Sequence, residues 1–255
     1  MTWTARVESV VPASVAFLVV IGAWWALTVV GDLPAFFLPP PDAVVGRLTG
    51  NPGLYLRNAL FTLEKVVGGG AIGVVGGFVL AIAITYVSLL RKILLPYLVT
   101  IRVLPKIAIA PLLLIYMGTG METAIVFVAL IAFFPMVLNA AAGFERAPRT
   151  HRDLLRSVDA PPLKTFAHVT LPYALPDIFA GLKQSVTLAV VGAIVAEWIV
   201  ADSGLGYLVL IGSENLQTDM MIAALFAMLA LGLVLYGSVV LLQQWIRRAG
   251  FEMRH

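Results

Sequence analysis

The chain has 255 residues, of which 60% are hydrophobic and only 12% are charged. So few polar side chains cannot cover a soluble protein of this size, which predicts an integral membrane protein. The net charge of +3 is too small to indicate nucleic-acid binding, and the lack of cysteine excludes disulfides and thiolate metal sites. Three histidines cannot assemble a metal cluster within the membrane: His151, His168 and His255.

Six apolar stretches are each close to the roughly 20 residues that a helix needs to cross a bilayer. They cover about residues 10–30, 66–90, 93–117, 121–143, 175–200 and 220–246. The first follows a single basic residue, Arg6, and lacks a small-x-small cleavage pattern, so it is interpreted as a retained anchor helix rather than a signal peptide. The sequence therefore predicts an all-α membrane protein with about six transmembrane helices.

The connection between the first two spans predicts an interfacial helix from Pro52 to Val66. Glycines at three- and four-residue spacing then open the second span, from Gly68 to Gly77. Small residues at these spacings allow helix backbones to approach closely, so we expect this face to pack against another span or a second copy. A nucleotide-binding role would need a strand before the glycines, and none is predicted.

The third span carries two basic residues, Arg102 and Lys106, which would share one face of a continuous helix. A charge at bilayer depth costs on the order of 2.5–3.5 kcal/mol, so such residues usually face protein or water and often line a pathway. Arg102 is close enough to the inner end to reach the headgroups, whereas Lys106 lies nearer the middle and is the better pathway candidate. Pro105 and Pro111 predict kinks, which mark either a hinge or a static bend.

Three further pathway candidates lie near span ends: Tyr116, Glu197 and Trp198. Glu197, near the outer end of the fifth span, either lines the pathway or only caps the outer rim. Aromatic residues at span ends are mostly interfacial anchors. Trp198 is either such an anchor or, because it is next to Glu197, a residue at the outer mouth of the pathway.

Basic residues cluster in the connection near 90–93, in the segment 146–164 and in the C-terminal tail, whereas the connections near 117–122 and 201–219 carry acidic residues only. The positive-inside bias therefore predicts that both termini and the segment 146–164 are cytoplasmic. Three basic residues oppose this orientation, because they fall on the outer side: Arg47, Arg57 and Lys65.

The most informative segment is the polar insert 151–186. It predicts a short amphipathic helix whose apolar face carries Leu154, Leu155 and Val158, and whose polar face carries Arg152, Asp153, Arg156 and Ser157. The run Asp159-Ala160-Pro161-Pro162 ends this helix. A second short helix, with Leu163, Phe166 and Val169 inward, is expected to reach Leu171-Pro172. The insert is either a solvated surface helix or a docking element for a cytoplasmic partner.

The sequence contains no phosphate-binding G-x-x-x-x-G-K-[ST] loop, no G-x-S-x-G elbow and no H-E-x-x-H pair. The chain has no visible means of hydrolysing ATP. If transport is active, its energy enters through another protein.

The insert resembles the cytoplasmic loop of permease subunits of binding-protein-dependent ABC importers, in which a Glu-Ala-Ala triplet precedes a glycine and a later apolar-x-Leu-Pro sequence. Here Asp153-Leu154-Leu155 replaces the triplet, Asp159 replaces the glycine, and Val169-Thr170-Leu171-Pro172 closes the pattern. The stretches 38–44 and 196–208 resemble the nitrate/sulfonate/taurine type. Together with 104–106, 111–112 and 117–120, the resemblance covers about residues 34–246.

This resemblance implies the type I ABC importer permease fold, with an anchor helix and interfacial segment in 1–65 and a permease core in 66–255 whose coupling loop spans about 144–174. It implies alternating access in a homodimer, two ATP-binding subunits that bind ATP and Mg²⁺, an extracytoplasmic solute-binding protein and a bacterial inner membrane. The chain itself would be neither an enzyme nor a cofactor carrier. The implied ATPase-coupling residues are Arg152, Asp153, Leu154, Leu155, Arg156, Val158, Asp159, Ala160, Leu163 and Phe166.

Two departures from the family pattern carry expectations of their own. Asp159 stands at a glycine position, and aspartate tolerates left-handed backbone geometry better than most residues. Leu154 and Leu155 are bulkier than alanines and require a deeper groove, which predicts a dedicated ATPase subunit rather than a shared one.

The alternative functions are an ion-driven secondary carrier or channel, which internal repeats or intramembrane acidic pairs would favour, and a membrane-embedded enzyme, which clustered polar residues within spans would favour. Neither pattern is found in the sequence. The solute stays open among nitrate, sulfonates, taurine and vitamin precursors, and Lys106 favours an anionic or strongly hydrogen-bonding group.

Overall fold

The chain folds into a bundle of long helices, as the composition predicts. The computed structural model describes residues 3–101, 104–200 and 202–248, and no strand occurs within these ranges. The long helices are α1 (Trp3–Val30), α3 (Pro52–Tyr86), α6 (Met121–Glu145), α9 (Leu171–Val200) and α11 (Thr218–Arg248). The shorter elements are α2 (Pro41–Gly50), α4 (Ser88–Ile101), a 3₁₀ turn (Lys106–Ile109), α5 (Ala110–Met117), α7 (Arg149–Ser157), α8 (Pro162–Thr165), a π-helical turn (Phe166–Thr170) and α10 (Leu205–Glu214).

Four of the described helical segments are long and apolar enough to cross a membrane: α3, α6, the segment 162–199 and α11. The described apolar part of α1, Ser14–Val30, is shorter. The predicted third span at 93–117 is not one continuous helix, because α4 and the segment 106–117 form an angle of 98°, as in a broken span or a re-entrant loop. Pro105 explains the break, since it lacks a backbone N–H and disfavours helical geometry at the residue before it.

The predicted interfacial helix at 52–66 and the second span are a single helix of 35 residues, α3. Its start follows helix-capping rules: Asn51 accepts a hydrogen bond from the Leu54 N–H at 3.3 Å, and Pro52 occupies the first turn. At 1.5 Å per residue α3 is about 52 Å long, well beyond the ~30 Å hydrocarbon core. The boundary expected between residues 65 and 66 therefore lies inside α3.

The glycine stripe of α3 packs against α6, which confirms the packing prediction. A Cβ atom on Gly69 would lie 2.6 Å from the Ile125 carbonyl oxygen, and one on Gly73 would clash with the carbonyl oxygen of Ala129. Helices α6 and α9 also approach closely, since buried Ser185 of α9 donates to the Ala132 carbonyl of α6 at 2.7 Å. Helices α3, α6 and α9 thus form the tightly packed centre of the subunit.

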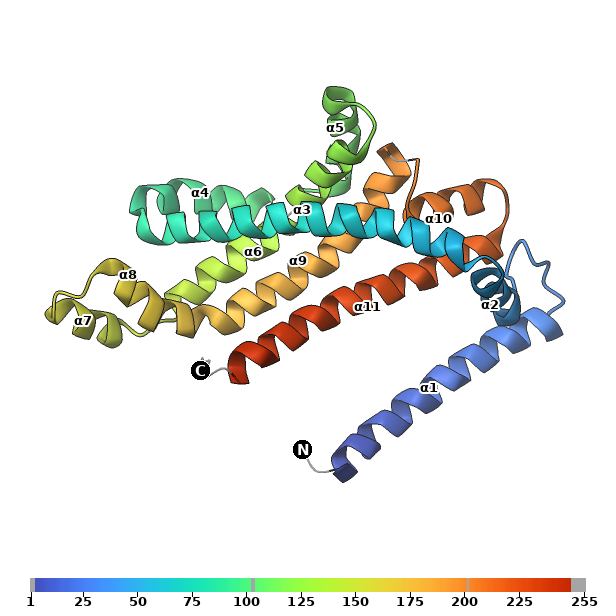
Figure 1. The fold of residues 1–255 in the computed structure, drawn as a ribbon, viewed down its shortest axis with the longest axis horizontal. Helices are drawn as coiled ribbons and strands as arrows, with labels where there is room; N and C mark the ends of the chain where they lie inside the picture. The colour runs from blue at the N-terminus through green and yellow to red at the C-terminus, as the bar shows by residue number, and fades with distance from the viewer. Residues whose placement is uncertain (1–2, 102–103, 201, 249–255) are drawn as a thin grey trace.

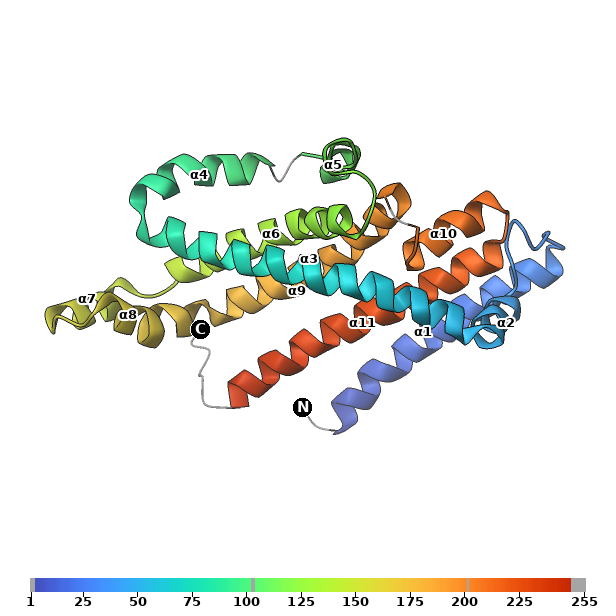
Figure 2. The same cartoon turned by 45° about the horizontal axis from the view of Figure 1, so that its top comes forward.

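The connecting elements gather at the two ends of this bundle. Helices α7 and α8 lie at one end, and α2 and α10 lie at the other (Figures 1 and 2). The α1 ribbon diverges from α11 towards its N-terminal end (Figure 1). It is held near its α2 end, where Trp24 donates to the Pro39 carbonyl at 3.1 Å and stacks on Phe226.

The second half of the insert differs from the prediction of a separate short helix ending at Leu171-Pro172. Residues 162–199 instead form one helical segment that runs into the membrane span. The π-helical turn accommodates Pro172, because the Leu171 N–H bonds to the Phe166 carbonyl and the backbone is widened before the proline. The part of the insert that projects from the bundle is therefore α7 and the turns beside it.

Candidate functional site

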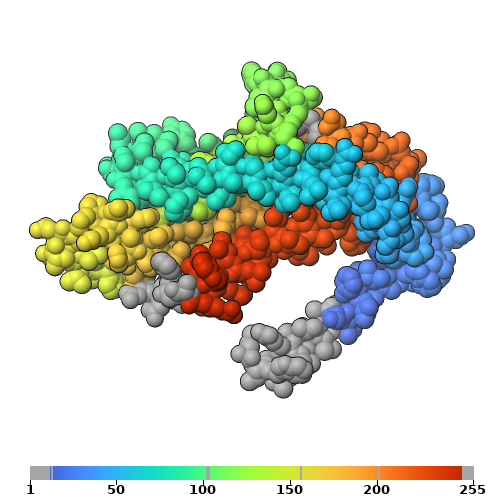
Figure 3. Space-filling model, in the orientation of Figure 1, coloured from blue at the N-terminus to red at the C-terminus, as the bar shows by residue number. Residues whose placement is uncertain are grey.

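The projecting end of the bundle exposes large apolar side chains. Leu154 is 64% exposed, Val158 is 68% exposed and Leu163 is 77% exposed, whereas Leu155 is half-buried. Helix α7 and the following turn extend past the ends of α3, α6 and α9 (Figure 3). Exposed apolar patches commonly mark interaction sites, so this surface is suited to being covered by a partner.

The turn after α7 has the backbone geometry expected at its aspartate. Asp159 adopts a positive φ of 50°, the left-handed conformation that a glycine would adopt without strain. The N–H of the next residue, half-buried Ala160, donates to the Leu155 carbonyl at 3.0 Å and closes the turn. This confirms that the turn survives with aspartate at the glycine position.

Phe166 lies on the inner side of the loop rather than on the exposed surface. Its ring centroid is 5.6 Å from that of Phe144 on α6 and 6.1 Å from that of Tyr86 on α3. Such tilted and edge-to-face ring pairs contribute about 0.5–1.5 kcal/mol beyond area burial. Phe166 therefore joins the loop to the ends of two spans and does not share the surface of Leu154 and Val158.

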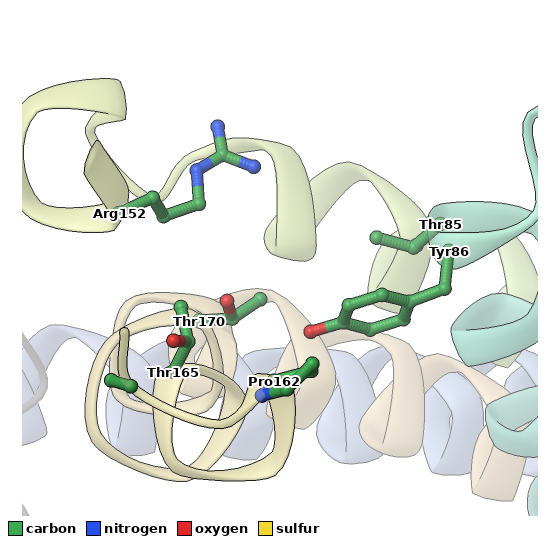
Figure 4. Close-up of a pocket in the computed structure, with 7 residues that line it drawn as sticks. Thr85, Tyr86, Arg152, Pro162, Thr165 and Thr170 are labelled. Carbon is green, nitrogen blue, oxygen red and sulfur yellow. The ribbon is translucent and has the colours of Figure 1, made fainter. Parts of the chain in front are cut away.

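Between this loop and the end of α3 lies a cavity of about 340 Å³. Figure 4 shows Arg152 from α7, Tyr86 from α3 and Thr165 from α8 around it. Arg152 also lines a second cavity, with Arg91, Glu145, Arg149 and Asp153 among its other lining residues. Asp153 is exposed. The side chain of Arg156 lies outside the described residues.

Two ion pairs fasten the base of the loop to the spans. Arg91 Nη2 lies 2.6 Å from Glu145 Oε1, and Arg146 Nε lies 3.0 Å from Asp177 Oδ2. Two of the basic residues that were assigned to the cytoplasmic side by charge are thus paired within the chain.

At the opposite end of the bundle, a fully buried ion pair joins α3 to α9. Lys65 Nζ lies 2.9 Å from Glu197 Oε1, and both side chains are at most 2% exposed. Lys65 also donates to the Ser203 carbonyl at 2.7 Å. A buried ion pair is tolerated only when further hydrogen bonds satisfy its remaining atoms, and this pair meets that condition.

The same cluster satisfies the first N–H groups of α10. The N–H groups of Gly204, Leu205 and Gly206 donate to Asn58 Oδ1, Thr62 Oγ1 and Glu197 Oε2 at 2.8, 2.8 and 2.7 Å. Gly204 has a φ of 120°, and a Cβ atom there would clash with the Glu197 carboxylate. These N–H groups have no partner within their own helix, so the cluster acts as its cap, and the helix dipole favours the carboxylate at this position.

Sequence reasoning missed this cluster because it assigned Lys65 to an outer connection. The signal was the spacing of Asn58, Thr62 and Lys65, which are four and three residues apart and share one face once 52–86 is taken as one helix. Glu197 points into this cluster, in contact with Lys65 and Thr62. The adjacent Trp198 is 47% exposed, and Tyr116 of α5 is 83% exposed.

Lys106 does not lie on a continuous helix with Arg102, because it opens the 3₁₀ turn after the break at Pro105. Arg102 lies outside the described residues. The Lys106 ammonium is half-buried, 5.5 Å from the centroid of the Phe134 ring on α6. It lines a cavity of about 170 Å³ between α6 and α9, with Asn139 and Gln184 as the other polar lining residues.

Most of the sequence matches a known family of transport proteins. Residues 73–248 match the model of the inner membrane component of binding-protein-dependent transport systems. The chain belongs to this family. The match includes α6, α7, α9 and α10, so it spans the projecting loop and the Glu197 side of the buried ion pair.

Relatives that match nearly the whole chain carry transporter names. An ABC transporter permease protein of Haemophilus influenzae is 33% identical, covering 87% of this chain and 90% of the relative. The riboflavin transport system permease protein of Chloroflexus aurantiacus is 29% identical, covering 92% and 88%. The aliphatic sulfonates transport permease protein of Escherichia coli is 30% identical, covering 89% and 88%. The chain is therefore a permease subunit of an ABC importer and a multi-pass membrane protein.

Proposed function

We propose that this permease imports a small organic solute, delivered by an extracytoplasmic solute-binding protein, by docking α7 into a cytoplasmic ATPase subunit. Two ATPase subunits bind ATP and Mg²⁺ and hydrolyse the nucleotide, while two copies of the permease enclose the solute path. The observation that carries this proposal is the set of exposed apolar side chains on the projecting loop: Leu154, Val158 and Leu163.

The coupling follows from the two opposite sides of the loop. Its outer side offers Leu154 and Val158 to the ATPase, and its inner side holds Phe166 against Tyr86 and Phe144. A movement of the ATPase cleft would be transmitted as a rigid displacement to the ends of α3 and α6, because packed aromatic rings shift together rather than deform. Of the proposed coupling residues, the exposed leucine and valine side chains contact the ATPase and Phe166 transmits the motion.

We place both termini and α7 in the cytoplasm. The basic residues that opposed this orientation are largely neutralised in the fold: Lys65 by Glu197, and Arg47 by Asp219 at 2.7 Å. The Asp219 hydrogen bond and charge raise the pKa of the Arg47 guanidinium further above its usual value. The orientation rests on the number of basic residues, because the segments 90–93 and 146–164 and the C-terminal tail together carry more of them than the opposite side.

The solute path is proposed to pass Lys106, and the range of solutes is that of the relatives: riboflavin, formylaminopyrimidine, aliphatic sulfonates and taurine. Glu197 is a less suitable contact, because its carboxylate is already engaged within the chain. Trp198 and Tyr116 remain candidates for the outer part of the path, and Arg102 remains one for the inner part.

The coupling proposal is tested with Leu154→Asp and Val158→Asp in the complete importer. A carboxylate buried in the ATPase groove without a partner should abolish co-purification of the ATPase and reduce uptake at least tenfold. Phe37→Asp, which adds the same charge at a 68% exposed apolar position between α1 and α2, is the matched control and should leave both unchanged. Normal uptake and an intact complex in both α7 variants would refute the docking surface.

A further inference from the structure

The cavity beside Lys106 contains hydrogen-bond donors and a positive charge but no acid. Its polar lining residues are Lys106, Asn139 and Gln184, and its apolar walls include Phe134, Leu138 and Leu188. None of the ion pairs in the described ranges involves Lys106, whose ammonium group lies over the Phe134 ring. A half-buried ammonium group in a membrane-spanning region normally has a counter-charge. The described residues supply no such charge to Lys106.

The hydrogen bonds of the Asn139 and Gln184 amides leave the Gln184 NH2 group without an acceptor among the described residues. Asn139 Nδ2 donates both to the Pro135 carbonyl at 2.7 Å and to Gln184 Oε1 at 3.2 Å, which uses both of its hydrogens. The second bond orients the exposed Gln184 side chain with its oxygen towards Asn139. The Gln184 Nε2 group therefore faces away from that bond and donates to no described residue. Asn139 is a positioning residue for Gln184.

We propose that this cavity binds the anionic group of the solute, a sulfonate, carboxylate or phosphate attached to a small apolar or aromatic body. Lys106 Nζ and Gln184 Nε2 donate to the anionic oxygens, and the walls from Phe134, Leu138 and Leu188 contact the body. This inference rests on the proposed solute path, and it deepens it by naming the chemical class of solute. The Lys106 ammonium group and the Gln184 amide can each donate to a different oxygen of a tetrahedral or planar anion, so an arginine is not needed to bind two oxygens.

The selectivity follows from the missing acid. A cation would meet the Lys106 charge without compensation, and a neutral solute would leave that charge unpaired when it displaced water. An anion offsets both the charge and the free Gln184 donor.

The test uses the complete importer in lipid nanodiscs, with acetylation of individual lysines by acetyl-N-hydroxysuccinimide followed by mass spectrometry. Millimolar ethanesulfonate, at constant ionic strength, should slow the acetylation of Lys106 at least about threefold. Neutral ethyl methyl sulfone should not. Lys183, one residue before Gln184 but bonded to Gln243 at 2.5 Å, is the internal control and should react at the same rate throughout.

Gln184→Leu removes the amide donor and should raise the ethanesulfonate concentration needed for protection about tenfold, the effect of losing one hydrogen bond to a charged group. Gln244→Leu, the same change at an exposed position on α11, should not alter it. Equal protection by the sulfone, equal protection of Lys183, or a Lys106 that is unreactive from the start would each overturn the inference. Because this measurement needs no ATP, its failure is distinguishable from a failure of the α7 docking test.

Discussion

Replacing Lys65 with methionine is the most informative single perturbation of this fold. Methionine keeps much of the volume of the side chain but leaves the Glu197 carboxylate buried, fully enclosed and without its cation. Breaking one partner of a buried ion pair costs about 3–5 kcal/mol, because the remaining charge is uncompensated. The free energy of unfolding should fall by about that amount, and α10 should loosen, since Glu197 also caps its first turn.

The second variant of this experiment removes both charges. Lys65→Met combined with Glu197→Gln eliminates the buried charge. The amide oxygen can replace Oε2 and accept from the Gly206 N–H, while the amide NH2 replaces Oε1 next to the Thr62 hydroxyl, to which it can donate. The double variant should therefore lie within about 1–2 kcal/mol of the wild type, so that the two substitutions are strongly non-additive.

The assay is unfolding of the purified chain in mixed micelles by titration with sodium dodecyl sulfate, followed by tryptophan fluorescence. Lys183→Met is the matched control, because Lys183 is half-buried but bonded to the neutral Gln243, and it should lose no more than about 1 kcal/mol. A Lys65→Met variant as stable as the wild type, or strictly additive effects in the double variant, would refute the role of the pair.

Substitutions at three further positions test the packing and the loop. Gly73→Val should prevent α3 from approaching α6 and lower the yield of folded protein in size-exclusion profiles. Gly76→Val, whose Cβ would make only ordinary contacts with Phe133, should not lower it. Equal yields would contradict the packing face assigned to α3. Phe166→Ala should leave the ATPase bound but separate ATP hydrolysis from uptake, while His168→Ala at an exposed position of the same turn should preserve their ratio. In the same micelle titration, Asp159→Gly should leave the free energy of unfolding unchanged or raise it by up to about 1 kcal/mol, and Asp159→Val should lower it by about 1–2 kcal/mol. The reverse order would argue against the left-handed turn.

The sequence was sufficient for features that depend on local chemistry. Composition alone predicted the helical membrane fold, glycine spacing predicted the α3 packing face, and the substitution of glycine by Asp159 predicted a left-handed turn. Each of these follows from the properties of a residue and its near neighbours in the chain.

The errors arose where a distant residue decides the outcome. Lys65 looked like an outer-loop charge because its partner, Glu197, is 132 positions away. For the same reason the sequence predicted two elements where the structure has α3 alone. A lysine is expected to end an apolar stretch unless a buried carboxylate neutralises it. Pro105 was expected to kink the third span. The two halves of this span instead form an angle of 98°, which is larger than the bend of a kinked continuous helix and corresponds to a break.

The length of α3 has a mechanical consequence. Twenty-one residues separate Lys65, which is locked to α9 and α10, from Tyr86, which touches Phe166 of the loop. At 1.5 Å per residue these two points are about 32 Å apart along one continuous helix. If the locked end serves as a pivot, a tilt of about 5° carries the Tyr86 end sideways by about 3 Å over this length. A small rotation at the Lys65 end and a displacement of about 3 Å at the loop end would then be the same motion.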